Sequence, residues 1–140
     1  MSDRFFIDTN IFAYSFDSKS KKKQILSKDI IAQSLLSNEG IISYQVVQEF
    51  LNISTRKFKT PLKVQDSKKY LHKILFPLCE ILPTEALFDI ALDIQSTTNY
   101  SFYDSTIIAA AINGKCKKLL TEDLKNGHTL HGVTIVDPFK

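Results

Sequence analysis

The sequence predicts an α/β fold, in which a mainly parallel central sheet of about five strands is flanked by helices. Short apolar segments alternate along the chain with longer segments of helical periodicity, as in folds where a helix follows each strand. The four prolines lie at the boundaries of these segments and outside every predicted element. With 140 residues and no linker or repeat, the chain is predicted to form one domain, residues 1–140.

The predicted elements follow from the apolar spacing and from the residues at each end. Strands are predicted at Arg4–Asp8, Gly40–Ser43, Cys79–Leu82, Lys118–Thr121 and Val133–Val136. Helices are predicted at Lys22–Ser37, Tyr44–Arg56, Val64–Phe76, Thr84–Thr98 and Phe102–Asn113. Ser43 is suited to begin the second of these helices as its N-cap, and Gly114 is suited to end the last as its C-cap.

The composition, 44% hydrophobic and 24% charged, is that of an ordinary soluble globular protein. No apolar run approaches the roughly 18–20 residues of a membrane span, and the N-terminus lacks a signal-peptide pattern. Cys79 and Cys116 are too few and too far apart for a disulfide scaffold or a zinc site, so we expect reduced thiols. These features predict a cytoplasmic protein that does not contact a membrane.

Basic side chains are unevenly distributed, although the net charge is only +3. They gather within residues 19–23, 56–73 and 115–118. Such groups can neutralise phosphates and attract a polyanion, but a solvated surface is the commoner explanation of lysine runs. The charge pattern alone therefore leaves both interpretations open.

Acidic residues stand where predicted strands end, which is the edge where parallel sheets bind ligands. Asp8 closes the first strand, and capping of the helix that follows would also explain it. Glu49 lies at the rim of an apolar helical arc formed by Val46, Phe50 and Ile53. A carboxylate in that place must be hydrated, paired or bound to a metal ion.

Two further acids come from the second half of the chain. Asp104 occupies the third position of a capping-box-like arrangement that begins at Ser101, yet apolar residues follow it on the same helix face. That face should point into the core, so we expect Asp104 at the end of the sheet. Asp123 follows the fourth strand, where its neighbour Glu122 is a rival for the same role.

Brought to one edge, these carboxylates would repel one another and raise their own pKa values unless a cation is present. Oxygen ligands without a cluster of His or Cys fit Mg²⁺ or Mn²⁺ rather than zinc. Such ions hold a phosphate oxygen and lower the pKa of a bound water, which can then attack phosphorus. The acids predicted to hold the ion are Asp8, Glu49, Asp104 and Asp123.

Four short motifs, taken together, resemble a known family. They are Asp8-Thr9-Asn10 after the first strand, Gln48-Glu49-Phe50, Tyr103-Asp104-Ser105 at the start of an Ala-rich helix, and Leu119-Leu120-Thr121-Glu122-Asp123. Their order and separations are similar to those of the PIN domain, most closely the VapC-type toxin ribonucleases of bacterial toxin–antitoxin pairs. The resemblance covers essentially the whole chain, and a final strand at Val133–Val136 agrees with it.

The resemblance implies a Rossmann-like parallel sheet and an endoribonuclease that depends on Mg²⁺ or Mn²⁺. It implies that the four acids are the catalytic residues at the metal. It also implies that Asn10 orients Asp8, and that Ser105 and Thr121 form hydrogen bonds around the site. The implied partners are an RNA substrate, a second copy of the chain in a homodimer, and an antitoxin that inhibits the enzyme.

Other functions make different demands on the sequence. A catalytically silent PIN-like module could bind RNA or a protein, although a binding role has no need of concentrated, repelling carboxylates. A phosphoacceptor receiver or a phosphatase would need a second carboxylate beside Asp8, where Thr9 and Asn10 stand. A nucleotide-binding Rossmann domain would need a GxGxxG pattern, which this sequence with four glycines lacks.

Overall fold

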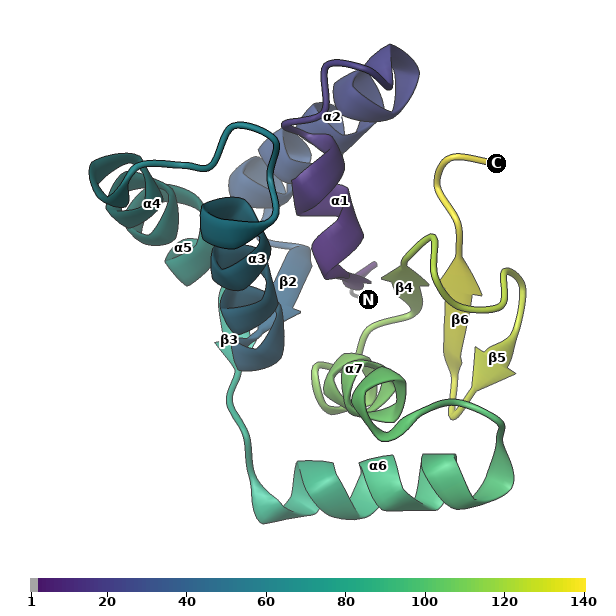
Figure 1. The fold of residues 1–140 in the computed structure, drawn as a ribbon. Helices are drawn as coiled ribbons and strands as arrows, with labels where there is room; N and C mark the ends of the chain where they lie inside the picture. Colours follow the sequence, from purple (N-terminus) through teal and green to yellow (C-terminus); the bar gives the residue numbers. More distant parts are fainter. Residues whose placement is uncertain (1–2) are drawn as a thin grey trace.

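A computed structural model describes residues 3–140 of the chain. At its centre is a six-stranded sheet in the order β3-β2-β1-β4-β6-β5 (Figure 1). The strands are β1 (Phe5–Ile7), β2 (Gly40–Ser43), β3 (Cys79–Ile81), β4 (Lys118–Leu120), β5 (Thr129–Leu130) and β6 (Val133–Val136). All neighbouring strands are parallel except β5 and β6. The predicted α/β class is confirmed, and the five predicted strands agree with the observed ones to within one residue at each end.

Helices cover both sides of this sheet. They are α1 (Thr9–Tyr14), α2 (Lys21–Ser37), α3 (Tyr44–Arg56), α4 (Val64–Tyr70), α5 (Phe76–Leu78), α6 (Glu85–Thr97) and α7 (Phe102–Asn113). Helix α7 lies against one side and contacts β1, β2, β4 and β6, with α6 packed outside it (Figure 1). Helices α1, α2 and α3 lie on the other side, where α2 and α3 contact β2.

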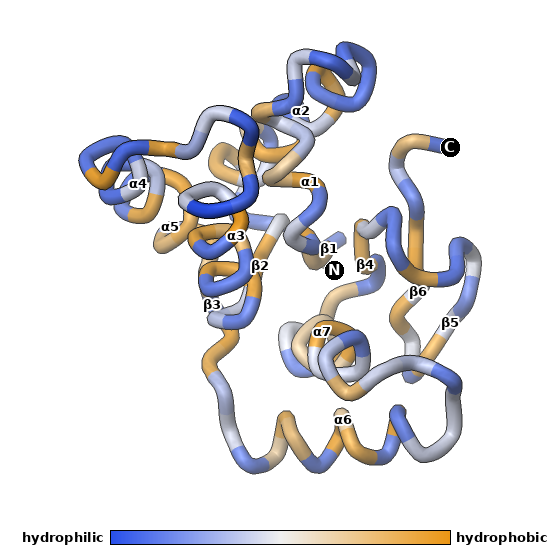
Figure 2. Tube along the Cα trace, in the orientation of Figure 1, coloured by the Kyte–Doolittle hydropathy of each residue, from blue (hydrophilic) through white to orange (hydrophobic). Residues whose placement is uncertain are grey.

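The core lies between the sheet and these helices. Phe6, Ile41, Leu119 and Ile135, from four adjacent parallel strands, are all buried. Figure 2 shows that α6 is hydrophobic on the side facing α7 and hydrophilic on its outer side. Helix α7 is buried continuously from Ser105 to Ala111, as its apolar sequence predicts. Because α7 packs between the sheet and α6, its first turn has a defined position at the edge of the sheet.

The helix predicted at Val64–Phe76 belongs to a longer helical segment with a wide turn inside it. A π-helical turn, η1 (Leu71–Leu75), lies between α4 and α5, and the helical path continues to Leu78. Pro77 therefore lies within a helical element, and the prediction that it marks a boundary was wrong. Proline has no N–H group to donate, and its ring crowds the preceding turn, which disfavours a regular α-helix at this point.

The strand β5 was not predicted from the sequence. His131 and Gly132 alone connect it to β6, and both have positive φ angles, 48° and 84°. Two left-handed residues in a row define a two-residue type I′ hairpin turn. The available signal was the His131-Gly132 dipeptide ahead of the alternating segment Val133–Val136.

Both predicted caps stand at the predicted positions but work differently. Ser43 precedes α3, yet its hydroxyl makes no capping hydrogen bond. Gly114 ends α7 with φ −77°, and the left-handed residue is Lys115, with φ 57°. A Cβ atom at Gly114 would collide with Cδ1 of Ile41. Close packing against the core, and not a left-handed backbone, is therefore the reason for a glycine at this position.

Two further observations bear on the environment of the protein. Cys79 and Cys116 are both free thiols. In the part of the chain that the structure describes, no helix combines the length and apolar character needed to cross a membrane.

Candidate active site

Asp8 lies at the junction of β1 and α1, at the carboxyl end of a central strand. Its side chain is buried, with 8% of its surface exposed. Oδ1 accepts a hydrogen bond from the backbone N–H of Thr9 at 2.7 Å, and Oδ2 accepts one from the Thr121 hydroxyl at 2.8 Å. Asp8 is thus the N-cap of α1, but capping uses only one of its two oxygens.

Ionised Asp8 is held in an unfavourable environment. Burial raises the pKa of Asp8 from 3.8 to about 7; hydrogen bonds from Thr121 and Thr9 counteract burial, and the charges of Glu49 and Asp123 add to the rise. Within residues 3–140, Asp8 forms no ion pair with Lys, Arg or His. A buried carboxylate with acids for neighbours and no cationic partner is stabilised by whatever cation binds beside it.

Thr121 connects Asp8 with Asp123. Its fully buried hydroxyl accepts hydrogen bonds from Asn10 Nδ2 at 3.2 Å and from the Asp123 backbone N–H at 3.1 Å. Because both lone pairs are used in this way, the hydroxyl proton is directed to Oδ2 of Asp8. One threonine therefore sets the orientation of Asp8 and the position of the turn that carries Asp123.

Asn10 takes a different place from the one that the resemblance implies. Its Nδ2 donates a hydrogen bond to Asp123 Oδ2 at 3.0 Å as well as to Thr121. Its Oδ1 accepts a hydrogen bond from the Glu122 backbone N–H at 3.4 Å. Asn10 therefore orients Asp123 directly and reaches Asp8 only through Thr121.

Glu122 is engaged outside this network. Its carboxylate accepts hydrogen bonds from the Tyr14 hydroxyl and from the Lys23 ammonium group, both at 2.6 Å. Burial alone would raise the pKa of Glu122, but the hydrogen bonds from Lys23 and Tyr14 outweigh it and lower the pKa below its usual value. Of the two acids, Asp123 is the one whose carboxylate accepts a hydrogen bond from Asn10 and whose charge contributes to the raised pKa of Asp8.

Glu49 reaches the same edge from α3. Its Oε1 accepts a hydrogen bond from the Thr9 hydroxyl at 2.6 Å, and its Oε2 accepts one from Gln45 Nε2 at 3.2 Å. Thr9 and Gln45 are site residues that sequence reasoning did not select. For Thr9 the signal was its place between Asp8 and Asn10; for Gln45 it was the spacing of four residues from Glu49 on one helix face.

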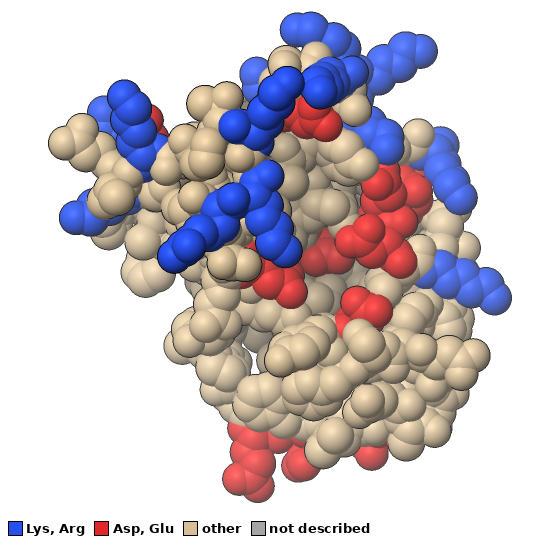
Figure 3. Space-filling model, in the orientation of Figure 1, with Lys and Arg blue, Asp and Glu red and all other residues tan. Residues whose placement is uncertain are grey.

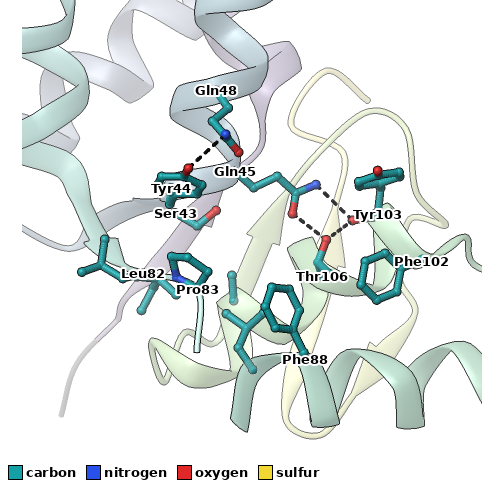
Figure 4. A pocket seen from close by; sticks show the side chains of 13 residues that line it. Ser43, Tyr44, Gln45, Gln48, Leu82, Pro83, Phe88, Phe102, Tyr103 and Thr106 are labelled. Atoms are coloured by element: carbon teal, nitrogen blue, oxygen red, sulfur yellow. Dashed lines mark hydrogen bonds between the residues drawn. The ribbon is translucent and has the colours of Figure 1, made fainter. Parts of the chain in front are cut away.

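Gln45 also ties α3 to the first turn of α7 (Figure 4). Its Nε2 donates to the backbone oxygen of Tyr103 at 3.3 Å, and its Oε1 accepts a hydrogen bond from the Thr106 hydroxyl at 2.5 Å. On the other side of this connection lies an apolar pocket of about 250 Å³, with Leu82, Phe88 and other apolar side chains in its walls. Gln45 thus lines that apolar pocket, contacts Glu49 and links two acid-bearing helices, α3 and α7.

Asp104 enters from the first turn of α7. Its backbone N–H donates to Ser101 Oγ at 3.1 Å, as the capping pattern predicts. Its half-buried carboxylate makes no hydrogen bond within residues 3–140, and its charge is not among those that raise the pKa of Asp8. Ser105, for which the resemblance implies a hydrogen bond beside the site, is fully buried, and its hydroxyl has no partner in the described part of the chain.

Acidic side chains gather in a hollowed band at the centre of one face of the molecule, bordered by lysine and arginine (Figure 3). No three His, Cys, Asp or Glu side chains within residues 3–140 converge closely enough to enclose an ion. Mg²⁺ does not need such a cage, because proteins usually hold it with one or two carboxylates and leave the other positions to water and phosphate. The oxygen donors present fit Mg²⁺ or Mn²⁺ and do not fit zinc.

The fold and the site define a class of protein: an α/β domain whose mostly parallel sheet carries acidic oxygen donors at the carboxyl ends of its strands. The family model of the PIN domain matches residues 5–126, and the chain belongs to the PIN domain family. The predicted resemblance is confirmed. No curated protein sequence matches the chain.

Several solved structures share this fold over most of their length. A toxin-antitoxin complex from Klebsiella pneumoniae is 16% identical with a TM-score of 0.68, covering 95% of this chain and 96% of that chain. VapBC2 from Rickettsia felis, bound to a DNA fragment from their promoter, is 18% identical with a TM-score of 0.66, covering 94% and 96%. Mycobacterium tuberculosis VapC20, described as a sarcin-ricin loop cleaving toxin, is 17% identical with a TM-score of 0.57, covering 85% and 91%. At these identities the likeness establishes the fold.

Proposed function

We propose that the chain is a metal-dependent endoribonuclease, formed by residues 1–140 as one domain, and the toxin of a toxin–antitoxin pair. The observation that carries the proposal is Asp8, a buried carboxylate in a PIN domain that has two acidic neighbours and no cationic partner within residues 3–140. A divalent cation beside Asp8 would supply the missing positive charge, and a phosphate oxygen of RNA would complete the coordination of that cation. The solved neighbour that cleaves the sarcin-ricin loop supports RNA as the substrate.

Each of the four acids has a distinct part in the proposed reaction. Asp8, oriented by Thr121, and Asp123, oriented by Asn10, hold the ion. Glu49 lies beside them on α3, where it accepts a hydrogen bond from Thr9. The carboxylate of Asp104, which forms no hydrogen bond or ion pair within residues 3–140, is available to accept a proton from the attacking water. When bound, Mg²⁺ or Mn²⁺ supplies a Lewis acid for a phosphate oxygen and lowers the pKa of the attacking water.

The direct test is cleavage of RNA by the purified protein with Mg²⁺ or Mn²⁺. Wild-type protein should cut RNA, and EDTA should stop it. Asp8→Asn and Asp104→Asn should fold, as judged by circular dichroism, and should not cut. Asp93→Asn, at an exposed position on α6, is the matched control and should cut like the wild type. Cleavage that continues in EDTA and in both site variants would rule the mechanism out.

The second candidate is a catalytically silent PIN-like module that binds RNA or a protein. It is favoured by one observation: within the described residues, no three potential ligands converge on one point. Titration with Mn²⁺, followed by calorimetry, separates the two functions. An ion that binds the wild type and not Asp8→Asn supports the enzyme, and a wild type that binds no divalent ion supports the silent module.

The proposed partners are an antitoxin and a second copy of the chain. The antitoxin is supported by two neighbours, which were solved as toxin-antitoxin assemblies. The homodimer is supported by large apolar side chains that are 40% to 70% exposed around α6 and α7, namely Phe88, Leu92, Leu82 and Tyr103. Light scattering should give a dimer mass for the wild type and a monomer mass for Leu92→Glu.

The two free thiols agree with a cytoplasmic location, which we also propose.

A further inference from the structure

An open pocket of about 730 Å³ extends from the acidic site along α1 to the loop that follows α3. Asn10 and Asp123 line one end of it, so the pocket and the proposed metal site share a wall. Its volume is within the range of about 300–1,000 Å³ that is typical of sites for small ligands. A molecule that binds at the acids can therefore extend into this pocket.

Part of the pocket wall is aromatic. Phe16 and Phe58 line it together with Tyr14, and the ring centroids of Phe16 and Phe58 lie 5.6 Å apart. The rings of Phe50 and Tyr70 also pack against Phe16, with centroids 5.8 Å and 5.3 Å from the centroid of the Phe16 ring. Phe16 is nevertheless 39% exposed. A ring that packs against other rings and is still partly exposed to solvent is a suitable surface for a base to stack on. Its side chain is already ordered, and stacking requires only an accessible π-face.

Unpaired lysines border the same pocket. Lys19, Lys57 and Lys59 line it and are exposed, and none of them forms an ion pair within residues 3–140. Lys23, by contrast, is neutralised by Glu122. Figure 3 shows basic side chains bordering the acidic band on this face. These ammonium groups are therefore free to contact phosphates.

We propose that this pocket receives an unpaired base of the RNA next to the phosphate that is cut, while Lys19, Lys57 and Lys59 contact the neighbouring phosphates. The inference rests on the proposed ribonuclease function and assigns a subsite to it. Asp123 of the proposed metal site, an aromatic surface and unpaired lysines line one pocket, and a nucleic acid strand alternates phosphates and bases in the same way. A single strand is required, because a base in a duplex cannot reach an aromatic platform.

The location of the base can be tested by photo-cross-linking. A short single-stranded RNA of mixed sequence that contains 5-iodouridine is bound in Mn²⁺ to the Asp104→Asn variant, which should not cut it, and then irradiated. Mass spectrometry should find cross-linked peptides that contain Tyr14, Phe16 or Phe58. Cross-links found only outside this pocket, or RNA that does not bind at all, would overturn the proposal.

The lysines are tested by binding of the same RNA over a range of salt concentrations. The double variant Lys57→Ala/Lys59→Ala is compared with Lys22→Ala/Lys68→Ala, which removes two exposed lysines outside the pocket and leaves the same net charge. The plot of log K against log salt has a negative slope, and the loss of two phosphate contacts should make it less steep by roughly 1.4, at about 0.7 per contact with a single strand. The control should keep a slope close to that of the wild type, and equal slopes for the two double variants would count against the subsite.

The aromatic platform is tested with Phe16→Leu, which keeps an apolar side chain and removes the ring. We expect the RNA affinity to fall roughly fivefold or more, as for the loss of one stacked base.

Failure of this inference differs from failure of the proposed function. RNA that binds and cross-links in the pocket but is never cut contradicts the ribonuclease and keeps the subsite. RNA that is cut normally while both pocket variants, Lys57→Ala/Lys59→Ala and Phe16→Leu, bind it like the wild type overturns the subsite and leaves the pocket to a protein partner.

Discussion

The charge of Asp8 should make the metal-free protein less stable as the pH rises. A buried acid whose folded pKa lies above its unfolded value favours folding in the protonated form. That contribution is fully present below the unfolded pKa of 3.8 and is lost as the pH rises through the folded pKa of about 7. The Asp8→Asn variant cannot ionise at this position, so it should lack this part of the pH dependence.

The size of the effect follows from the pKa change. At about 1.4 kcal/mol per pKa unit, the rise from 3.8 to about 7 corresponds to an upper limit of roughly 4 kcal/mol. Of this, roughly 2–3 kcal/mol falls between pH 5 and pH 8, since the unfolded chain is already ionised at pH 5. The amide of Asn loses one hydrogen bond to Thr9 or Thr121, but that loss is the same at every pH.

The assay is urea denaturation in EDTA at several pH values for the wild type, Asp8→Asn and the control Asp93→Asn. The free energy of unfolding of Asp8→Asn, relative to wild type, should rise by roughly 2–3 kcal/mol from pH 5 to pH 8. Addition of Mn²⁺ at pH 8 should stabilise the wild type and not Asp8→Asn, because a ligand stabilises only the state that binds it. A difference between wild type and Asp8→Asn that does not change with pH would refute the reasoning.

Four further substitutions probe three contacts around this site and one packing contact in the core. Thr121→Val keeps the shape but removes the hydroxyl proton from Asp8, so urea denaturation should show a loss of about 1–3 kcal/mol. Asp123→Asn should abolish RNA cleavage, whereas Glu122→Gln should keep it and lower the stability by less than about 1 kcal/mol, since Glu122 is partly exposed; the opposite assignment would follow from the reverse result. Gly40→Ala would place a Cβ against side chains of α2 and β1, so thermal unfolding should reveal a loss of about 1–3 kcal/mol.

The central strands could be predicted from the sequence because they are buried and their apolar residues are contiguous. In β2, for example, all four residues from Gly40 to Ser43 are buried, and the amphipathic helix α3 that follows ends the pattern. The two residues of β5 carry no such pattern, since one is exposed and the other is only partly buried. Their strand is defined by the left-handed turn at His131 and Gly132, which is a backbone property and not an apolar one.

The sequence alone led to the residues of the candidate site, but it did not lead to the contacts among them. The rule that ligands bind at the carboxyl ends of parallel strands led to Asp8 and Asp123 without any knowledge of side-chain directions. The hydrogen bond from Thr9 to Glu49 joins residues 40 positions apart, and the bond from Gln45 to Tyr103 joins residues 58 positions apart. Contacts of this kind depend on how α1, α3 and α7 pack, which local patterns do not specify.

Packing gives Glu122 and Asp123 different partners, a difference that local sequence does not reveal. The two acids are adjacent on one turn, and what separates them is Lys23 on α2 together with Tyr14 on α1. This ion pair removes the charge of Glu122 from the acidic site, so that fewer negative charges oppose an approaching phosphate. Lys23 also lies over the Tyr14 ring, 4.6 Å from its centroid, and Tyr14 lines the pocket beside Asp123. The same contact that engages Glu122 outside the acidic network therefore also orients Tyr14, which lines the pocket where we expect the RNA base to pack.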